Sequence, residues 1–372
     1  MKLTITFVFT LFYCTLFSQQ VSTYISGPAN IDDCLFISSD GSMYASRFTG
    51  GTVSKIVDGV VSVFSDTLSN ANGIAEDSEG NLYVADHYAN EVFKFDIDGN
   101  GVLFCDDIIK PSGLVKIPGS DTLIITSYGQ HKVYKVGPDG NAILYLDNDI
   151  LDGPVSVNYN SEEILFIANY NDGKILKYDH LNDSLHIITD LNISSLGFMC
   201  FANGFLYATS AGFSAGEDPM IIKVDPNSGD TIHFANNGYG YVDGDITVAQ
   251  FQRPNGIVAS PDGTKLYVSE YSAQRIRMIE GIVSGIENIS FENQSISLYP
   301  NPSQDHLSIK VDGLSNESIS YRIINSLGST IETNKKALDN GRIRIEHSLL
   351  PGIYFVEIRI AKQSITKKLI VQ

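Results

Sequence analysis

The chain has 372 residues, of which 43% are hydrophobic and 18% charged, so it can bury a sizeable core and is not a disordered protein. Its formal net charge of −18 argues against binding to nucleic acid, whose phosphates need a basic surface, and against adhesion to anionic membranes. A chain of this length indicates one large domain together with a smaller one.

The first 18 residues have the pattern of a signal peptide. Lys2 gives a short basic start, an apolar run extends from Leu3 to Phe17, and the small residue Ser18 marks a cleavage point. The run is too short to span a bilayer comfortably. We therefore predict that residues 1–18 direct export to the periplasm, and that the mature chain has no transmembrane span.

Three cysteines remain once the signal peptide is removed. They are Cys34, Cys105 and Cys200, and no two of them have the spacing of metal ligands. An odd number in an exported protein does not form a disulfide framework. We expect all three to be buried as small apolar residues.

The middle of the chain repeats one unit six times. A glycine turn followed by an apolar strand recurs at spacings of 39, 41, 42, 41 and 60 residues. Each unit also holds four short strand-like runs bounded by Gly, Asp and Asn, a pattern typical of a propeller blade. We predict an all-β protein in which residues 19–283 form a six-bladed β-propeller. The equivalent positions of the six units are Tyr44, Tyr83, Ile124, Phe166, Tyr207 and Tyr267.

The position of the outermost strands predicts how the ring closes. Residues 21–25 look like an outer strand but precede any complete blade, whereas the sixth blade, ending at 275–279, has no outer strand of its own. We expect residues 21–25 to complete the last blade, because this pairing removes an exposed edge.

The repeats resemble those of the NHL-repeat propellers. Residues 72–86 and 253–270 carry the resemblance most clearly, and it covers about residues 20–282. Residues 238–251 are similar to an extended loop that many of these proteins have before a repeat, and this loop accounts for most of the spacing of 60. The resemblance implies a fold and no particular function.

The tail has a different pattern. Residues 284–296 are a polar linker, and residues 297–372 show the short alternating strands of a β-sandwich. Four motifs in this region resemble, in order, the C-terminal sorting domain of the type IX (Por) secretion system of the Bacteroidetes. The resemblance implies that the type IX machinery is a partner of residues 297–372, and that the protein is secreted or displayed at the cell surface. The motifs are Tyr-Pro-Asn-Pro at 299–302, Asn-Ser-Leu-Gly at 325–328, Leu-Pro-Gly-Ile-Tyr at 350–354 and Lys-Lys-Leu-Ile-Val at 367–371.

The charges also divide the chain in two. Residues 19–287 contain 35 acidic and 14 basic residues, a net −21, whereas residues 288–372 contain 8 acidic and 10 basic residues, a net +2. The acidic propeller is suited to solubility and to divalent cations, or it is simply a solvated surface.

Ligands of propellers usually bind at the channel mouth, where loops from all blades meet. We expect two residues per blade to line it. The first set stands before the Gly-Ile of the innermost strand, and it is polar in three neighbouring blades and apolar opposite them. The second set ends the following strand. The first set is Asp33, Asn72, Ser112, Val155, Leu196 and Asn255, and the second is Arg47, Asp86, Ser127, Asn169, Ser210 and Glu270.

Two interpretations of the polar half remain open. Asp33, Asn72 and Asn255 offer one carboxylate and two amide oxygens, which suits a divalent cation such as Ca²⁺. The same side chains could instead cap backbone groups in turns, as Asn and Asp commonly do. His87, beside Asp86, is a weak candidate for an acid or base.

The chain also resembles the six-bladed propellers of the gluconolactonase/senescence-marker-protein type. Members of that family hold a divalent metal through a Glu, two Asn and an Asp at inner-strand positions. Asp33 stands at the first of these positions, while Ser112, Val155 and Leu196 replace the other three ligands. These replacements argue against a lactonase site of the family's type.

We therefore predict an exported propeller that acts as a binding module for a glycan, a peptide or a protein, and not as an enzyme. The alternative is a metal-dependent hydrolytic enzyme of lactonase or lyase type that acts through Asp33, Asn72, Asn255 or His87. A structural role in the cell envelope is the third interpretation.

Overall fold

The computed structural model describes residues 19–282 except 181, 215 and 236, and residues 296–372 except 312–317, 326–329 and 361–362. The predicted signal peptide, and the predicted linker up to residue 295, lie outside the described residues. Contacts divide the chain into two compact units, residues 1–285 and 286–372. Within the described ranges, no helix is long and apolar enough to cross a membrane.

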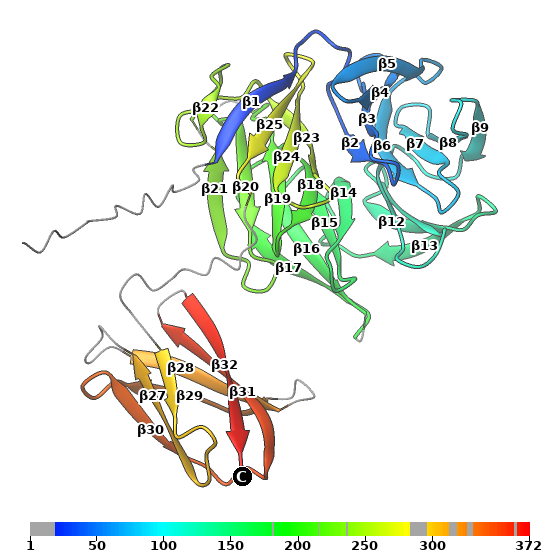
Figure 1. Ribbon diagram of the computed structural model, residues 1–372. Helices are drawn as coiled ribbons and strands as arrows, with labels where there is room; N and C mark the ends of the chain where they lie inside the picture. Colours follow the sequence, from blue (N-terminus) through cyan, green and yellow to red (C-terminus); the bar gives the residue numbers. More distant parts are fainter. Residues whose placement is uncertain are drawn as a thin grey trace, which may run out of the picture. The chain divides into compact units, whose positions relative to one another are not determined.

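The first unit is a six-bladed β-propeller, as the repeats predict (Figure 1). Five blades are four-stranded antiparallel sheets whose strands run in chain order from the channel outward. Blade 1 has β2 (Leu35–Ile37), β3 (Met43–Ser46), β4 (Val53–Val57) and β5 (Val60–Ser65). Blade 2 has β6 (Ala71–Glu76), β7 (Leu82–Asp86), β8 (Glu91–Phe95) and β9 (Gly101–Cys105). Blade 3 has β10 (Pro111–Lys116), β11 (Leu123–Ser127), β12 (Lys132–Val136) and β13 (Ala142–Asp147).

The remaining blades continue around the ring. Blade 4 has β14 (Pro154–Tyr159), β15 (Leu165–Asn169), β16 (Lys174–Asp179) and β17 (Ser184–Asp190). Blade 5 has β18 (Leu196–Ala202), β19 (Phe205–Ser210), β20 (Met220–Val224) and β21 (Thr231–Ala235). Blade 6 has β23 (Pro254–Ala259), β24 (Lys265–Glu270) and β25 (Arg275–Glu280). The inner strands contact one another in chain order, and β23 contacts β2, so the ring is closed.

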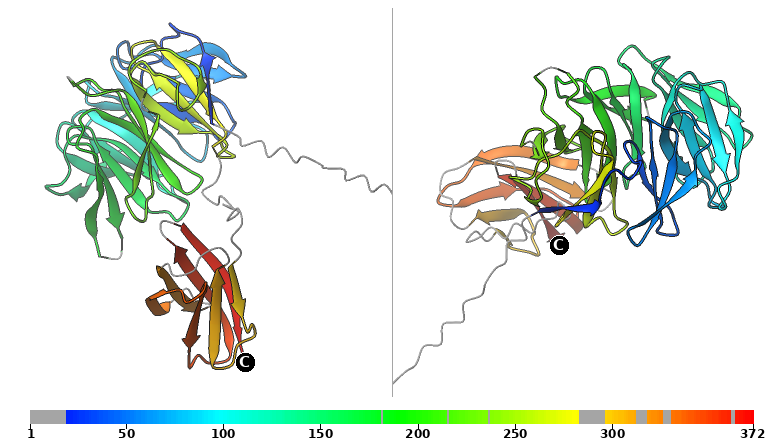
Figure 2. Two further views of the ribbon diagram at one scale, coloured as in Figure 1. Left: turned by 90° about the vertical axis from the view of Figure 1, so that its left-hand side faces the viewer. Right: turned by 90° about the horizontal axis from the view of Figure 1, so that it is seen from above.

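The last blade is completed from the other end of the propeller. β1 (Gln20–Ile25) pairs antiparallel with β25, with Val21 opposite Ile279. This confirms the predicted closure by residues 21–25. A two-residue strand from the inserted loop, β22 (Gly244–Asp245), adds to the outer side of β1. In Figures 1 and 2, β1 (blue) lies beside the yellow strands of blade 6. The closing pair leaves the sixth blade without the exposed edge that a missing strand would create.

Two features of the sequence let the blades pack closely. Five of the six equivalent apolar positions are buried, and the sixth, Tyr267, packs its ring at a tilt against that of Tyr24 of β1, with 4.9 Å between ring centroids. At the inner strands the backbones themselves touch. A Cβ added to Gly73 would lie 2.0 Å from the carbonyl oxygen of Ser112 in the next blade, so only glycine fits there. The predicted burial of Cys34, Cys105 and Cys200 as free thiols is confirmed.

The second unit is the predicted β-sandwich. One sheet has the order β26-β27-β30 and the other β29-β28-β31-β32. Alternating residues of β27, such as Leu307 and Ile309, and of β28, such as Ile319 and Tyr321, form a common core between the sheets. The strands are β26 (Ile296–Tyr299), β27 (His306–Val311), β28 (Ser318–Asn325), β29 (Thr330–Ala337), β30 (Arg342–Glu346), β31 (Gly352–Ile360) and β32 (Gln363–Val371).

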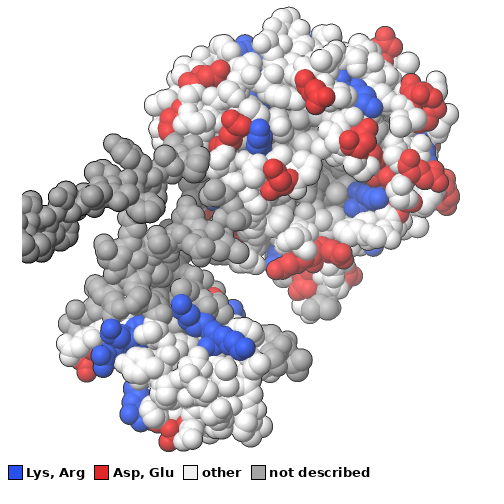
Figure 3. All heavy atoms as spheres, viewed as in Figure 1, with Lys and Arg blue, Asp and Glu red and all other residues white. Residues whose placement is uncertain are grey.

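The two units differ in surface charge. On the face drawn in Figure 3, acidic side chains are spread over the propeller, whereas Lys and Arg predominate on the sandwich. This agrees with the division of charge along the sequence.

Candidate functional site

A pocket of about 390 Å³ opens at the end of the channel where the inner strands begin; we call it the mouth pocket. Every blade contributes to it, as expected for a propeller mouth. It combines a polar group, an aromatic wall and one lysine. Its lining residues are Asp33, Phe48, Asn72, His87, Tyr88, Lys110, Ser112, Tyr128, Val155, Tyr170, Gly197, Phe198, Phe213, Asn255 and Tyr271.

A β-bulge recurs at the start of the inner strands and aims the first set into the pocket. In blade 2 the pairing of β6 with β7 shifts register between Ala71 and Ile74, and in blade 6 it shifts between Pro254 and Ile257. Residues inside such a bulge are released from the ladder, and their side chains point in a new direction. Asp33 instead lies just before β2. The structure brings together five members of the first set, which are Asp33, Asn72, Ser112, Val155 and Asn255.

The polar half of the pocket is built around Asp33. Its carboxylate is 3% exposed, and its Oδ1 accepts a hydrogen bond of 2.6 Å from Nδ2 of Asn255. Among the described residues, Oδ2 of Asp33 and Oδ1 of Asn72 are buried without a hydrogen-bond partner. Burial, and secondarily the neighbouring Asp32, raises the pKa of Asp33 well above its usual value. The polar half therefore presents two unused oxygen acceptors.

Aromatic residues from blades 1, 3, 4 and 6 form much of the remaining lining, which we call the aromatic wall, and they were not predicted. In four blades the residue directly after the second set is Phe or Tyr, and it lines the pocket. Across the wall, Tyr128 and Tyr170 lie 6.0 Å apart between ring centroids, and Phe213 packs edge-on against Tyr271 at 5.2 Å. The sequence does carry a signal for these residues, because an aromatic residue recurs directly after the second set in four blades. The four residues are Phe48, Tyr128, Tyr170 and Tyr271.

His87 occupies the same following position in blade 2 and is buried among aromatic rings. Its ring centroid lies 5.4 Å from Phe48 and 4.9 Å from Tyr88. Nδ1 lies 3.2 Å from the carbonyl oxygen of Pro111 and 3.1 Å from Oγ of Ser112. Because a carbonyl only accepts, Nδ1 carries a proton and donates it to this oxygen. Burial lowers the pKa of His87 to about 4, so it stays neutral at physiological pH.

Lys110 is the basic residue of the pocket. Its Nζ lies 5.7 Å from the ring centroid of Tyr88 and 5.6 Å from that of Tyr128. Its backbone nitrogen donates to Oδ1 of Asn90 at 2.9 Å, and its carbonyl accepts from the nitrogen of Tyr128 at 3.0 Å. These two backbone bonds fix the segment that carries the side chain.

The second set does not line the mouth pocket; most of its members hold the loops between blades. Asp86 accepts hydrogen bonds of 2.7 and 2.8 Å from the backbone nitrogens of Ser69 and Asn70. Glu270 accepts one of 2.6 Å from the nitrogen of Gln252. Ser127, Asn169 and Ser210 donate to loop carbonyls of Ile109, Ile150 and Ser194.

Blade 1 departs from this arrangement. Asp32, in the segment before β2, accepts a hydrogen bond of 2.6 Å from the backbone nitrogen of Phe48. Arg47 lies next to Phe48 but is not among the residues that line the pocket, and its Nε is buried without a hydrogen-bond partner in the described chain. The side chain that holds this loop is therefore that of Asp32, whereas Arg47 contributes backbone hydrogen bonds to Gly51 and Thr52.

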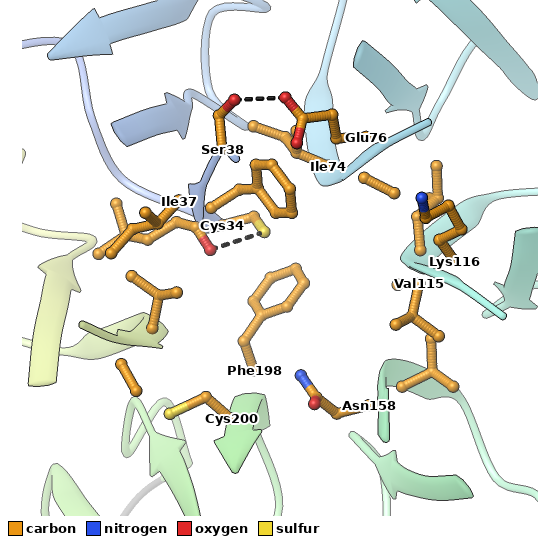
Figure 4. A pocket seen from close by; sticks show the side chains of 18 of the residues that line it. Cys34, Ile37, Ser38, Ile74, Glu76, Val115, Lys116, Asn158, Phe198 and Cys200 are labelled. Carbon is orange, nitrogen blue, oxygen red and sulfur yellow. Dashed lines mark hydrogen bonds between the residues drawn. The ribbon is translucent and has the colours of Figure 1, made fainter. Parts of the chain in front are cut away.

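Blade 5 also differs from the expected arrangement. Leu196 is fully buried in the core beside Phe166, and Gly197 and Phe198 line the pocket in its place. Phe198 also lines a larger cavity of about 680 Å³ at the opposite end of the channel, which we call the far cavity. In Figure 4 its ring points into the centre of the far cavity, among the inner strands. Phe198 therefore forms the floor between the two.

The residues present do not form a strong metal site. The structure, over its described ranges, holds no group of three or more His, Cys, Asp or Glu that could bind a metal ion. Of the predicted ligands, Asn255 directs its NH₂ group at Asp33, and the buried oxygens without a partner are Oδ2 of Asp33 and Oδ1 of Asn72. Two oxygens are fewer than the six to eight that Ca²⁺ takes.

Residues 297–372 match the family of secretion system C-terminal sorting domains. No curated protein matches the chain. The propeller is similar to solved structures at low identity. An auxiliary nutrient binding protein from Bacteroides thetaiotaomicron is 16% identical over 70% of this chain and 76% of that chain, with a TM-score of 0.61. Its counterpart from Bacteroides ovatus is 12% identical over 70% and 76%, with a TM-score of 0.59.

A gluconolactonase from Xanthomonas campestris is also similar. It is 16% identical over 70% of this chain and 89% of that chain, with a TM-score of 0.55. At such identities the likeness shows the propeller fold alone. The tail shows more, because its sorting domain makes the protein a substrate of the type IX secretion system, secreted or displayed at the cell surface.

Proposed function

We propose that the exported propeller is a binding module whose ligand occupies the mouth pocket. The observation that carries the proposal is the pairing of unused buried acceptors on Asp33 and Asn72 with an aromatic wall. Convergent polar groups in a largely apolar pocket are the usual construction of a small-molecule site. The ligand is a sugar unit of a glycan, a peptide or an exposed segment of a protein. The similarity to nutrient binding proteins supports the same interpretation.

Binding without turnover is favoured by what surrounds the candidate catalytic groups. His87 is neutral, and its protonated nitrogen is already directed at Pro111 and Ser112. Asp33 is buried with a raised pKa. Oγ of Ser112 lies 3.1 Å from Nδ1 of His87, but a protonated Nδ1 donates to that hydroxyl and cannot take its proton, so the pair does not form an activated nucleophile.

The test is a thermal-shift screen of the full chain against monosaccharides, oligosaccharides, amino acids and short peptides, with hits measured by calorimetry. Asn72→Ala removes a mouth acceptor, and Asn158→Ala, in the far cavity, is its matched control. We expect the hits to weaken in Asn72→Ala and to be unchanged in Asn158→Ala. Hits that weaken only in Asn158→Ala would overturn the proposal.

A hydrolytic enzyme is the second candidate, because Asp33, Asn72, Asn255 and His87 do meet in one pocket. Calorimetric titration of Ca²⁺ and Zn²⁺ into the protein and its Asp33→Ala variant, followed by an assay with glucono-δ-lactone, tests it. A micromolar metal site that is lost in Asp33→Ala, together with lactone turnover, would favour the enzyme. No heat of metal binding in either protein would exclude the metal-dependent enzyme.

A further inference from the structure

The mouth pocket contains one acidic and one basic side chain that the protein leaves without a counter-charge. Among the described residues, the carboxylate of Asp33 has no Lys, Arg or His within ion-pair distance, and its Oδ2 has no hydrogen-bond partner. Lys110 likewise forms no ion pair with any carboxylate of the described chain, and contacts the rings of Tyr88 and Tyr128 instead. Both residues line the same pocket.

Asp33 is the more informative of the two. Its side chain is almost completely buried, and its other oxygen is held by the amide of Asn255 at 2.6 Å. A buried carboxyl without a counter-charge is held in its neutral form, and a cationic ligand beside it would favour the ionised form. Oδ1 of Asn72, in the neighbouring blade, adds a second unused acceptor. Together they suit a group with several N–H donors and a positive charge.

Lys110 sits on another side of the pocket, in the loop that enters blade 3. Its backbone is fixed at both its nitrogen and its carbonyl, so the position of the side chain is built into the loop. The rings beneath its ammonium group stabilise the charge by cation–π contact and leave its N–H donors unused. An ammonium with free donors in an aromatic pocket suits a carboxylate.

Resting on the proposed function, we propose that the mouth pocket binds a zwitterion, namely a free α-amino acid or a dipeptide. Its ammonium group is bound by Asp33 and Asn72, and its carboxylate by Lys110. The aromatic wall receives an apolar side chain. The volume of about 390 Å³ is near the lower end for ligand pockets, which suits one or two residues and not a long chain. A neutral sugar would leave both charges unpaired.

The test is calorimetry of the full chain with L-phenylalanine and the dipeptide alanyl-phenylalanine, each free, N-acetylated and C-amidated. We expect a free form to bind, and capping either end to weaken it by about tenfold or more, because a charged group is then left unpaired. In Asp33→Asn, the acetylated and free ligands should bind alike. In Lys110→Gln, the amide and free ligands should bind alike.

Each variant should lose discrimination at one end of the ligand only, which a folding defect would not produce. Circular dichroism checks that both variants are folded. Failure of both free ligands to bind, or capped ligands that bind as well as free ones, would overturn the zwitterion. The zwitterion proposal can fail while the proposed binding function holds. A sugar or larger peptide that binds and weakens in Asn72→Ala would leave the binding module intact and exclude the zwitterion.

Discussion

Replacing Arg277 with methionine should strongly destabilise the propeller, because it removes a counter-charge from a buried carboxylate. Arg277 is fully buried, and its Nη1 lies 3.3 Å from Oε1 of Glu270. The same guanidinium donates to the carbonyls of Gln250 at 2.9 Å and Val242 at 3.0 Å, and pairs with Asp243 at 2.5 Å. It therefore ties the inserted loop to the blade that closes the ring.

The size of the effect follows from these contacts. Removing one partner of a buried ion pair costs about 3–5 kcal/mol. Glu270 keeps Arg275, whose Nε lies 3.3 Å from Oε2, so we expect the lower end of that range. In a domain of this size 1 kcal/mol shifts the Tm by about 2–4 °C, so a loss of about 3 kcal/mol lowers it by roughly 6–12 °C.

Thermal unfolding of the wild type, Arg277→Met, Glu270→Gln and the double variant measures the effect. The double variant also removes the buried charge, so it should be more stable than the sum of the single effects by at least about 1 kcal/mol. A loss below about 0.5 kcal/mol in Arg277→Met, or additive single effects, would refute the reasoning.

Three further predictions concern the mouth pocket. Because burial raises the pKa of Asp33, its ionised form destabilises the fold as the pH rises through that pKa. Asp33→Asn should therefore raise the Tm at pH 7 and raise it less at pH 4; an equal or opposite change in calorimetry would contradict this. Burial lowers the pKa of His87 to about 4, so neutral His87 stabilises the fold fully at a pH above its ordinary pKa of about 6.5. That stabilisation is lost as the pH falls toward 4. An NMR titration should place its midpoint near 4 and not near 6.5. Phe198→Ala should join the mouth pocket to the far cavity and lower stability by about 3 kcal/mol in urea unfolding, whereas an unchanged midpoint would mean that its ring does not fill the channel.

The fold could be predicted because each blade repeats the same local pattern. The closure by β1 followed from counting outer strands, since blade 6 lacked one and residues 21–25 had no blade. The first set was largely predictable for a similar reason. A glycine recurs where the inner strands touch, and the residue before that glycine lines the mouth pocket in most blades. In blade 5, where Phe198 follows the glycine, the choice of Leu196 was wrong.

The second set was predicted to line the channel mouth and does not, because side chains alternate along a strand. Successive residues of a strand point to opposite sides. The residue that faces the channel is therefore the one after each predicted residue, and the predicted residue faces the space between blades. Asp86 and Glu270 therefore hold backbone nitrogens, and the next residue, such as Tyr271, lines the mouth pocket. Lys110 was not predicted because its position carries no recurring residue type. The residues with the equivalent backbone bond in other blades are Asn70, Gly153, Ser195 and Arg253.

The most direct test of the mouth site uses His87 as a reporter. The imidazole signals are recorded by NMR while the first ligand from the thermal-shift screen is added, with His186 of β17 and His233 of β21 as internal controls. We predict saturable shifts at His87 and none at the two controls. Saturable binding that leaves the His87 signals unchanged would contradict the account.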